Sequence, residues 1–221
     1  MSGDIHQTLQ ALIRVEHLRG TQTKRSPVVT VSHDYGCGGR SLARRLSHAL
    51  GVPLYDQALL DSIAASTGID AALLARLDEQ ARPHWTQWLT HFQALHRQEQ
   101  VQYYLQLVNL CLNILQQGGV IVGRGAHIIL ANHPVFRLRI VGGCDHCAAR
   151  IANREGVDFA TARGMAEQAN REKRRFIWDY FHRELDDPRA FDLVVNSDRM
   201  DDERLFGLLL NAIEAFQSRR T

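Results

Sequence analysis

Lysine is almost absent from this chain: Lys24 and Lys173 are the only lysines among 26 basic residues. The excess of arginine suits phosphate recognition, because a planar guanidinium binds phosphate oxygens through two parallel hydrogen bonds. A high-GC coding bias explains the same composition equally well. The formal net charge is only +2, which leaves no bulk electrostatic attraction to nucleic acid or to a membrane surface.

Long hydrophobic runs are also missing, and no segment has the apolar length that a membrane-spanning helix requires. Residues 1–20 carry Asp4, Arg14 and Glu16 and lack the apolar centre of a secretory signal. Cysteine is scarce, with four in the chain, and without an export signal no disulfide framework is expected. The expected compartment is therefore the cytoplasm.

The sequence does contain short apolar strands that alternate with helices. Strands are expected at residues 28–32, 53–55, 120–122, 136–141 and 191–196. Helices are expected at 41–50, through most of 57–117, over most of 145–185 and at 201–217. This alternation is typical of an α/β domain, with a five-stranded parallel sheet covered by helices on both faces.

Two segments are expected to be additions to this alternating core. Residues 1–26 combine an amphipathic helical pattern with a polar linker, and we interpret them as an extension of a domain spanning 27–221. The helical stretch 57–117 carries Trp85 and Trp88 at helical spacing in an aromatic stripe. Such a stripe is explained by core packing or by a seam between copies of the chain, so a homo-oligomer is possible through this insert.

A glycine-rich turn follows the first expected strand and runs into a helix. Glycines let backbone N–H groups approach an anion, and the helix N-terminus adds the positive end of its dipole. The turn therefore predicts a phosphate cradle, with a purely structural turn as the alternative. Its residues are Gly36, Cys37, Gly38, Gly39, Arg40 and Ser41.

The lysine that normally follows the last glycine of such a loop is missing. Arg40 stands in its place, or Gly39 does if the loop is aligned one position earlier. Ser41 fits the hydroxyl that contacts Mg²⁺ or phosphate in such loops, or it is simply a helix N-cap. The sequence alone leaves open whether the cradle works with a substituted cation.

Two cysteine features each admit two interpretations. Cys37 is either a thiol of low pKa beside a helix N-terminus or, as we favour, a small residue that fits the loop. Cys144 and Cys147 form one C-x-x-C pair, but no second pair of ligands follows at zinc spacing. A metal site there is only weakly indicated.

Arginines also follow the third and fourth expected strands. Arg124, flanked by glycines, is placed to grip a phosphate, with a surface turn as the alternative. Further along, arginines four residues apart share helix faces, where a bound anion or nearby glutamates would neutralise them. These pairs are Arg150 with Arg154 and Arg171 with Arg175.

Candidate binding residues directly follow four of the expected strands. In a parallel sheet, ligands bind beyond the carboxyl ends of the strands, so these residues should converge on one rim. They are the loop at 36–41, Asp56, Gly123-Arg124 and Asn196-Ser197.

Four segments, in this order and spacing, resemble the cytidylate kinase-like family of nucleoside monophosphate kinases. They are residues 30–40, 51–56, 120–125 and 186–197, and the likeness covers about 27–217. The resemblance implies a P-loop NTPase fold with a helical insert at 57–117 and a basic lid at about 153–185. It implies phosphoryl transfer from ATP with Mg²⁺ to a nucleoside monophosphate, CMP or dCMP first.

The resemblance also implies roles for individual residues. The residues of the cradle would hold the donor phosphates, with Ser41 near Mg²⁺ and Arg40 as cation. Arg124 would contact the acceptor phosphate or base, and Asp56 would contact the acceptor or the Mg²⁺ shell. The lid arginines that clamp the transferred group would be Arg150, Arg171 and Arg175, with Arg174 as an alternative to Arg175.

Two departures from cytidylate kinases keep other functions open. Cytidylate kinases carry a loop lysine, which this branch generally lacks, and Gly-Arg-Asp where this chain has Gly123-Arg124-Gly125. The missing aspartate removes an expected acceptor contact. A nucleotide-binding module without catalysis and a kinase for a non-nucleotide small molecule are the alternatives.

Overall fold

The computed structural model describes residues 26–66 and 98–218. Within these ranges, five strands form one parallel sheet in the order β2-β3-β1-β4-β5. The strands are β1 (Val28–His33), β2 (Leu54–Tyr55), β3 (Gly119–Val122), β4 (Phe136–Val141) and β5 (Leu193–Asn196). Because β1 is central, the loop that follows it emerges in the middle of the rim formed by the strands' carboxyl ends.

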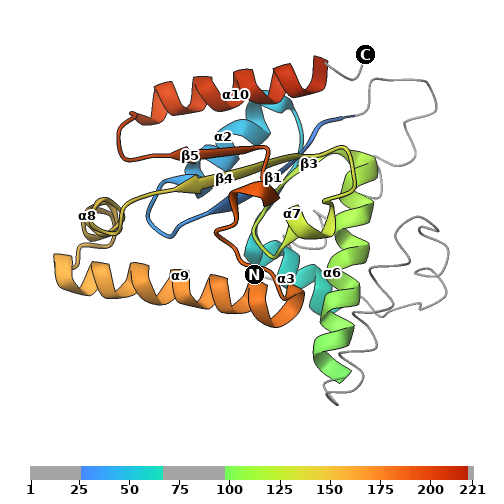
Figure 1. The fold of residues 1–221 in the computed structure, drawn as a ribbon, viewed down its shortest axis with the longest axis horizontal. Helices are drawn as coiled ribbons and strands as arrows, with labels where there is room; N and C mark the ends of the chain where they lie inside the picture. Colours follow the sequence, from blue (N-terminus) through green and yellow to red (C-terminus); the bar gives the residue numbers. More distant parts are fainter. Residues whose placement is uncertain (1–25, 67–97, 219–221) are drawn as a thin grey trace.

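Helices cover both faces of the sheet (Figure 1). On one face lie α2 (Gly39–Leu50) and α10 (Asp202–Ser218). The other face is covered by α3 (Gln57–Ser66), α6 (Gln98–Gln117), α7 (Ala126–Ile129) and α9 (Phe159–Phe181). The helix α8 (Cys144–Glu155) sits beyond the end of β4, and a short 3-10 turn, η1 (Pro188–Ala190), precedes β5. The expected α/β architecture is confirmed.

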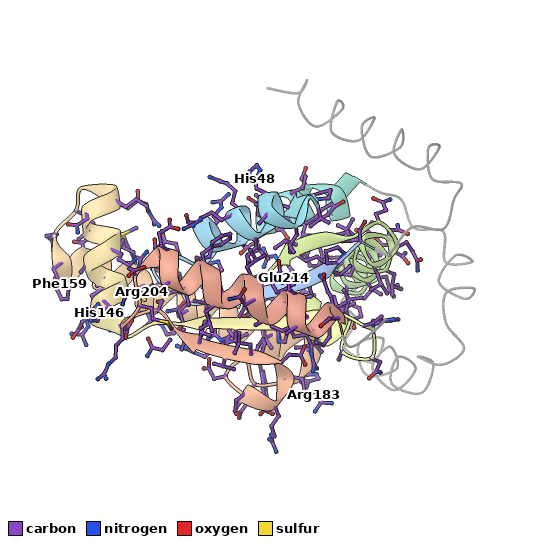
Figure 2. The ribbon with its side chains drawn as sticks, turned by 90° about the horizontal axis from the view of Figure 1, so that it is seen from above. His48, His146, Phe159, Arg183, Arg204 and Glu214 are labelled. Carbon is purple, nitrogen blue, oxygen red and sulfur yellow. The ribbon has the colours of Figure 1, made fainter. Side chains whose placement is uncertain are left out.

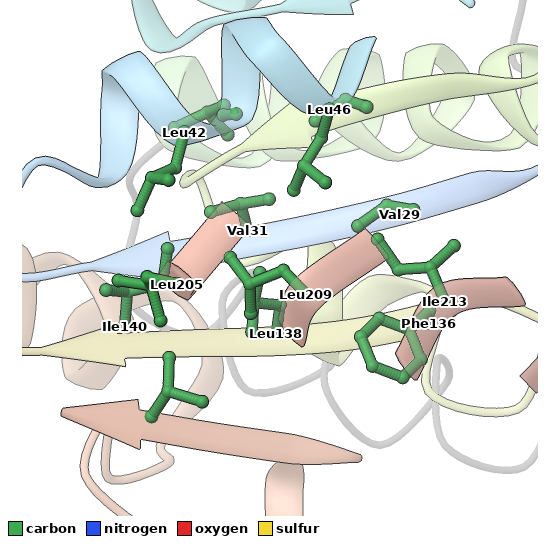
Figure 3. Close-up of a cluster of buried hydrophobic side chains, with 14 of the residues drawn as sticks. Val29, Val31, Leu42, Leu46, Phe136, Leu138, Ile140, Leu205, Leu209 and Ile213 are labelled. Carbon is green, nitrogen blue, oxygen red and sulfur yellow. The ribbon is translucent and has the colours of Figure 1, made fainter. Parts of the chain in front are cut away.

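A buried apolar cluster joins the sheet to α2 and α10 (Figure 3). Val31 and Leu138 of the sheet meet Leu42 of α2 and Leu209 of α10, and each is at most 1% exposed. A second cluster on the opposite face packs α3, α6 and α7 against β1 and β3. Helices bury both faces of the central strands, and the apolar side chains in these two clusters hold the rim in place.

The expected single helical segment over 145–185 is two helices. Gly156, with φ of 69°, ends α8 in the left-handed conformation. Asp158 then caps α9 by accepting a hydrogen bond from the Thr161 N–H at 3.0 Å. Glycine after a helix and aspartate at the next N-cap are the usual signals for such a break. The segment at about 153–185 that is expected to be a basic lid therefore includes the end of α8 and all of α9, which form a hairpin.

Other boundaries shift by a few residues. The first helix begins at Gly39 rather than at Ser41. The strand β5 begins at Leu193 rather than at residue 191, after the 3-10 turn η1 at Pro188–Ala190. The expected N-terminal helix and the tryptophan stripe lie outside the described residues. Across 26–66 and 98–218, no helix has the length and hydropathy to span a membrane.

Candidate active site

The glycine-rich loop connects the central strand β1 to α2. Gly38 is the N-cap of α2 and has φ of 83°, a left-handed conformation that suits glycine. In the described part of the chain, no side chain caps this helix start. The N–H groups of a first helical turn have no partner within the helix, so the start of α2 can receive an anion.

Neither position aligned with the missing lysine places a cation in this loop. A Cβ atom on Gly39 would lie 2.4 Å from Cβ and 2.5 Å from Cγ of His33, so the histidine side chain fills that space. Arg40 donates a hydrogen bond to Asp56 at 2.6 Å, and its side chain is 63% exposed. The structure thus pairs two expected site residues, Arg40 and Asp56, with each other.

His33 is a partly buried, neutral histidine. Burial, followed by the neighbouring Lys173 ammonium, lowers the pKa of His33 to about 4. Its Nδ1 lies 2.8 Å from the Asp34 carbonyl oxygen. The His33 side chain therefore occupies the space beside Gly39 and does not titrate near neutral pH.

The α8–α9 hairpin is fastened directly to the loop. Lys173 Nζ donates a hydrogen bond to the His33 carbonyl at 2.8 Å, and Asn170 Oδ1 accepts one from the Tyr35 N–H at 2.8 Å. The Arg154 guanidinium donates to the Tyr35 hydroxyl at 3.1 Å. Lys173 belongs to the basic helical segment of the sequence but not to its expected site residues, and its contact with the loop comes from the packing of α9.

Asp34, the next residue of the turn, is held by a buried arginine. Arg139 lies on β4 with a side chain only 3% exposed. It donates to Asp34 at 2.7 Å and to Asp186 at 2.8 Å, and the second oxygen of Asp34 accepts from the Gly142 N–H at 3.2 Å. A buried ion pair holds its geometry strongly because either charge left alone would be costly.

Arg150 lies over the loop beside a small cavity. Its guanidinium would be 2.7 Å from a Cβ atom on Gly38, and it binds the Asp202 carboxylate at 2.9 and 3.0 Å. His146 of α8 and Arg204 of α10 mark this end of the molecule in Figure 2. The cavity holds about 170 Å³ and is lined by Cys37, His146, Cys147, Arg150, Ser197, Asp198 and Met200.

The cysteines of this region are packing residues. Cys37 is 1% exposed, and burial raises the pKa of its thiol. Burial also raises the pKa of Cys147 to about 12. A buried thiol of raised pKa is a poor nucleophile, which agrees with our preferred interpretation of Cys37 as a small residue that fits.

Arg124 forms a second cluster at the end of β3, next to β1. The Gly123 N–H donates to the Val31 carbonyl at 2.9 Å, which joins this turn to the central strand. Arg124 has φ of 51°, an uncommon conformation for a residue with a side chain, and such strain tends to gather at functional sites. The acceptor candidate therefore lies on the same rim as the loop.

The Arg124 side chain is held from three helices. Both carboxylate oxygens of Asp61, on α3, accept hydrogen bonds from the Arg124 guanidinium. The bond from Arg124 Nε is 2.7 Å long. Tyr103 from α6 donates to the same carboxylate at 2.6 Å. The guanidinium also lies over the Phe176 ring of α9, 4.6 Å from its centroid. The sequence contained no local signal for Asp61, which is 63 residues from Arg124.

Arg171 and Arg175 occupy a different face of α9 from Asn170 and Lys173. Arg171 is 64% exposed and pairs with Glu167, and Arg175 is 83% exposed and pairs with Asp179. The structure brings neither of them to the loop. Their role in phosphoryl transfer stays a prediction, whereas Lys173 contacts the loop directly.

Acid is expected to destabilise the fold through two histidines, His127, which is buried, and His33, which is partly buried. Burial lowers the pKa of His33 to about 4 and that of His127 to about 3. Because the unfolded chain binds protons at pKa near 6.5, stability present above that pH falls as pH drops toward 4 and then 3. Urea unfolding from pH 7 to pH 4 should show a loss of a few kcal/mol, reduced in His127→Asn. An unchanged midpoint would contradict this expectation.

Comparison with known proteins gives a consistent result. The model of the cytidylate kinase-like family matches residues 28–199. A protein named cytidylate kinase from Methanothrix thermoacetophila is 26% identical over 192 residues, covering 86% of this chain and 99% of that protein. A solved structure of an uncharacterized protein from Eubacterium ventriosum shares the fold, with a TM-score of 0.70 and 24% identity, covering 86% of this chain and 99% of the other.

The family match spans most of the domain. It includes the glycine-rich loop, the strand β1 with its neighbours β3 and β4, Arg124 and the α8–α9 hairpin. Its extent includes all five strands of the parallel sheet. The chain therefore belongs to the cytidylate kinase-like family, and its activity class is that of a kinase, a phosphotransferase.

Proposed function

We propose that the protein transfers the γ-phosphoryl group of ATP to a nucleoside monophosphate, with CMP or dCMP as the first acceptors to test. One observation carries the proposal. An anion-binding helix start and a strained, oriented arginine follow two adjacent strands, β1 and β3, on the same rim. Two phosphate-binding groups at the ends of neighbouring strands suit a reaction in which the phosphates of a donor and of an acceptor must lie side by side.

The donor side consists of the loop, Arg150 and the adjoining cavity. The Arg150 guanidinium packs against Gly38, where a Cβ would meet it, and is thus close enough to pair with ATP phosphates held by the loop. The cavity beside Arg150 lies where the rest of the donor nucleotide would extend. The exposed Ser41 could contact Mg²⁺. No group of three or more His, Cys, Asp or Glu side chains suited to a metal is found within the described ranges, so phosphates and water would supply most ligands.

The acceptor side consists of Arg124 and the residues that hold it. Asp61 and Tyr103 fix the guanidinium while Phe176 supports its face. An acceptor phosphate would meet an arginine already oriented for bidentate binding, which reduces the ordering cost of the complex. The relative named cytidylate kinase supports CMP as the first choice.

The proposed reaction needs positioning and charge stabilisation. An acceptor phosphate oxygen bonds to the γ-phosphorus of ATP as the bond to the β-γ bridging oxygen breaks, and ADP leaves. The acceptor oxygen is already anionic, so the step requires no general base. Negative charge on the transferred group would be stabilised by the loop N–H groups and by arginines. No covalent intermediate with the protein is involved.

A coupled assay of ADP formation across all nucleoside monophosphates, with ATP and Mg²⁺, tests the proposal. We expect turnover that depends on CMP or dCMP. Absence of turnover together with absence of ATP binding by calorimetry would refute it. ATP binding without turnover on any acceptor would instead indicate the nucleotide-binding module, and turnover on a non-nucleotide alone would change the substrate class.

A further inference from the structure

We propose that Lys173, carried by α9, is the phosphate-binding cation of the glycine-rich loop and replaces the lysine that the loop itself lacks. The inference rests on the proposed use of ATP and adds a residue to that site. Its consequence is that the cradle is built from two distant parts of the chain, the β1–α2 turn and the α8–α9 hairpin.

The first argument is steric. A side chain at Gly39 would collide with His33, because the nearest approach to the histidine Cβ is 2.4 Å. Contacts under 3.0 Å essentially never occur for real Cβ atoms. Arg40 is turned toward Asp56. The loop therefore cannot hold a lysine at one aligned position and directs its arginine away at the other, so its cation must come from elsewhere.

The second argument is the position of Lys173. Its ammonium is 2.8 Å from the carbonyl oxygen of His33, the last residue of β1 and the first of the turn, and 6.0 Å from the centroid of the Tyr35 ring. An ammonium has three N–H donors, and the bond to His33 uses one. A flexible four-carbon stem lets the same group turn from a carbonyl oxygen to a phosphate oxygen.

The third argument is that contacts with Tyr35 fix the part of α9 that carries Lys173 against the glycine-rich loop. The Tyr35 N–H donates to Asn170, one helical turn before Lys173. Tyr35 also packs against a cluster of buried residues from both hairpin helices, which includes Ile151, Ala162 and Ala166. A cation anchored in this way is preorganised, so little conformational entropy is lost when phosphate binds.

The charges around Lys173 suit a group that exchanges partners. Asp34 attracts the ammonium, whereas Arg139 from β4 repels it, and the thiols of Cys37 and Cys147 lie nearby. Burial is the largest influence and lowers the pKa of Lys173 to about 8. A partly desolvated ammonium without a full counter-charge gains much from a polyphosphate. ATP affinity should accordingly weaken as pH rises above about 8.

Calorimetric binding of ATP and of inorganic tripolyphosphate at pH 7 tests the inference with Lys173→Met and Lys173→Arg. We expect Lys173→Met to weaken both ligands by roughly 10- to 100-fold, the range of a charge-assisted hydrogen bond. Lys173→Arg should recover part of the loss. The matched control is Arg163→Met on the same helix, where an exposed arginine pairs with Asp145 and Glu167; its affinity should equal wild type.

A labelling experiment on the unaltered protein covers the case in which Lys173→Met fails to fold. The chain has only two lysines, so an amine-reactive reagent gives two lysine sites, which peptide mass spectrometry separates from each other and from the α-amino group. We expect ATP to slow labelling of Lys173 at least several-fold. The extent of labelling at Lys24 is the internal reference for the amount of reagent that reacted with and without ATP.

The outcomes separate this inference from the proposed function. Equal ATP affinity of Lys173→Met and wild type, or labelling of Lys173 unchanged by bound ATP, would overturn the inference and leave the kinase proposal standing. Lys173-dependent ATP binding without turnover would support the inference and refute the kinase. A wild-type protein that binds no ATP would overturn both.

Discussion

Replacing Arg124 with methionine is expected to lower kcat/KM for the acceptor nucleotide by roughly 100- to 1,000-fold, the range for losing a strong anion-stabilising donor. ATP affinity should change little, because Arg124 follows β3 whereas the donor loop follows β1. The guanidinium is oriented by Asp61 and by the Phe176 ring before any ligand arrives. Steady-state kinetics with varied acceptor, together with ATP calorimetry, measures both quantities.

A matched control for this variant is Arg137→Met. Arg137 also forms a two-bond pair with an aspartate, at 3.0 and 2.6 Å from Asp192, but it lies on β4 away from the acceptor cluster. Its loss should lower stability without changing acceptor kinetics. Equal kinetic effects of Arg124→Met and Arg137→Met would show that Arg124 acts only through stability.

The role of Asp61 can be separated from that of Arg124 by a double-variant cycle. Asp61→Asn removes the carboxylate that holds the guanidinium, so the acceptor KM should rise more than kcat falls. In the Arg124→Met background the same change should have almost no effect, since the group to be positioned is gone. Additive effects would contradict a positioning role for Asp61.

Restoring a lysine to the loop by Gly39→Lys is expected to weaken ATP binding by at least roughly 10-fold rather than to strengthen it. The new side chain would overlap the His33 ring, and overpacking of this kind costs about 1–3 kcal/mol. The loop would have to shift, and its N–H groups would lose their arrangement around phosphate. Calorimetry with ATP and thermal unfolding measure the two effects.

Gly164→Ala provides the control for Gly39→Lys. A Cβ on Gly164, within α9, would meet nothing within 4 Å, and alanine in a helix is favoured over glycine by about 1 kcal/mol. This variant should gain slight stability and keep its ATP affinity. The double variant His33→Gly with Gly39→Lys should bind ATP better than Gly39→Lys alone, because the blocking ring has been removed. If Gly39→Lys alone exceeded wild type, the steric argument would fail.

Local sequence determined the framework of this protein. Strand runs such as Val28–Ser32 and Phe136–Val141 carry apolar side chains on the face that α2 and α10 bury, and the structure confirms all five strands. The glycine loop is equally local, since backbone conformation and helix start depend on neighbouring residues. The convergence of the loop and Arg124 follows from the geometry of parallel strands, and the register of β1 with β3 agrees with it.

Only the tertiary structure decided which side chains meet at that framework. Lys173 is 140 residues from His33, and Asp61 is 63 residues from Arg124. A basic helix shows its charges in sequence but not the face that packs inward, so the sequence does not show that Lys173, rather than Arg171 or Arg175, contacts the loop. That choice depends on how the α8–α9 hairpin docks against Tyr35, which is a long-range packing property. The sequence predicts a phosphate cradle that has no lysine of its own, and the packing of α9 brings Lys173 against the end of β1 beside it.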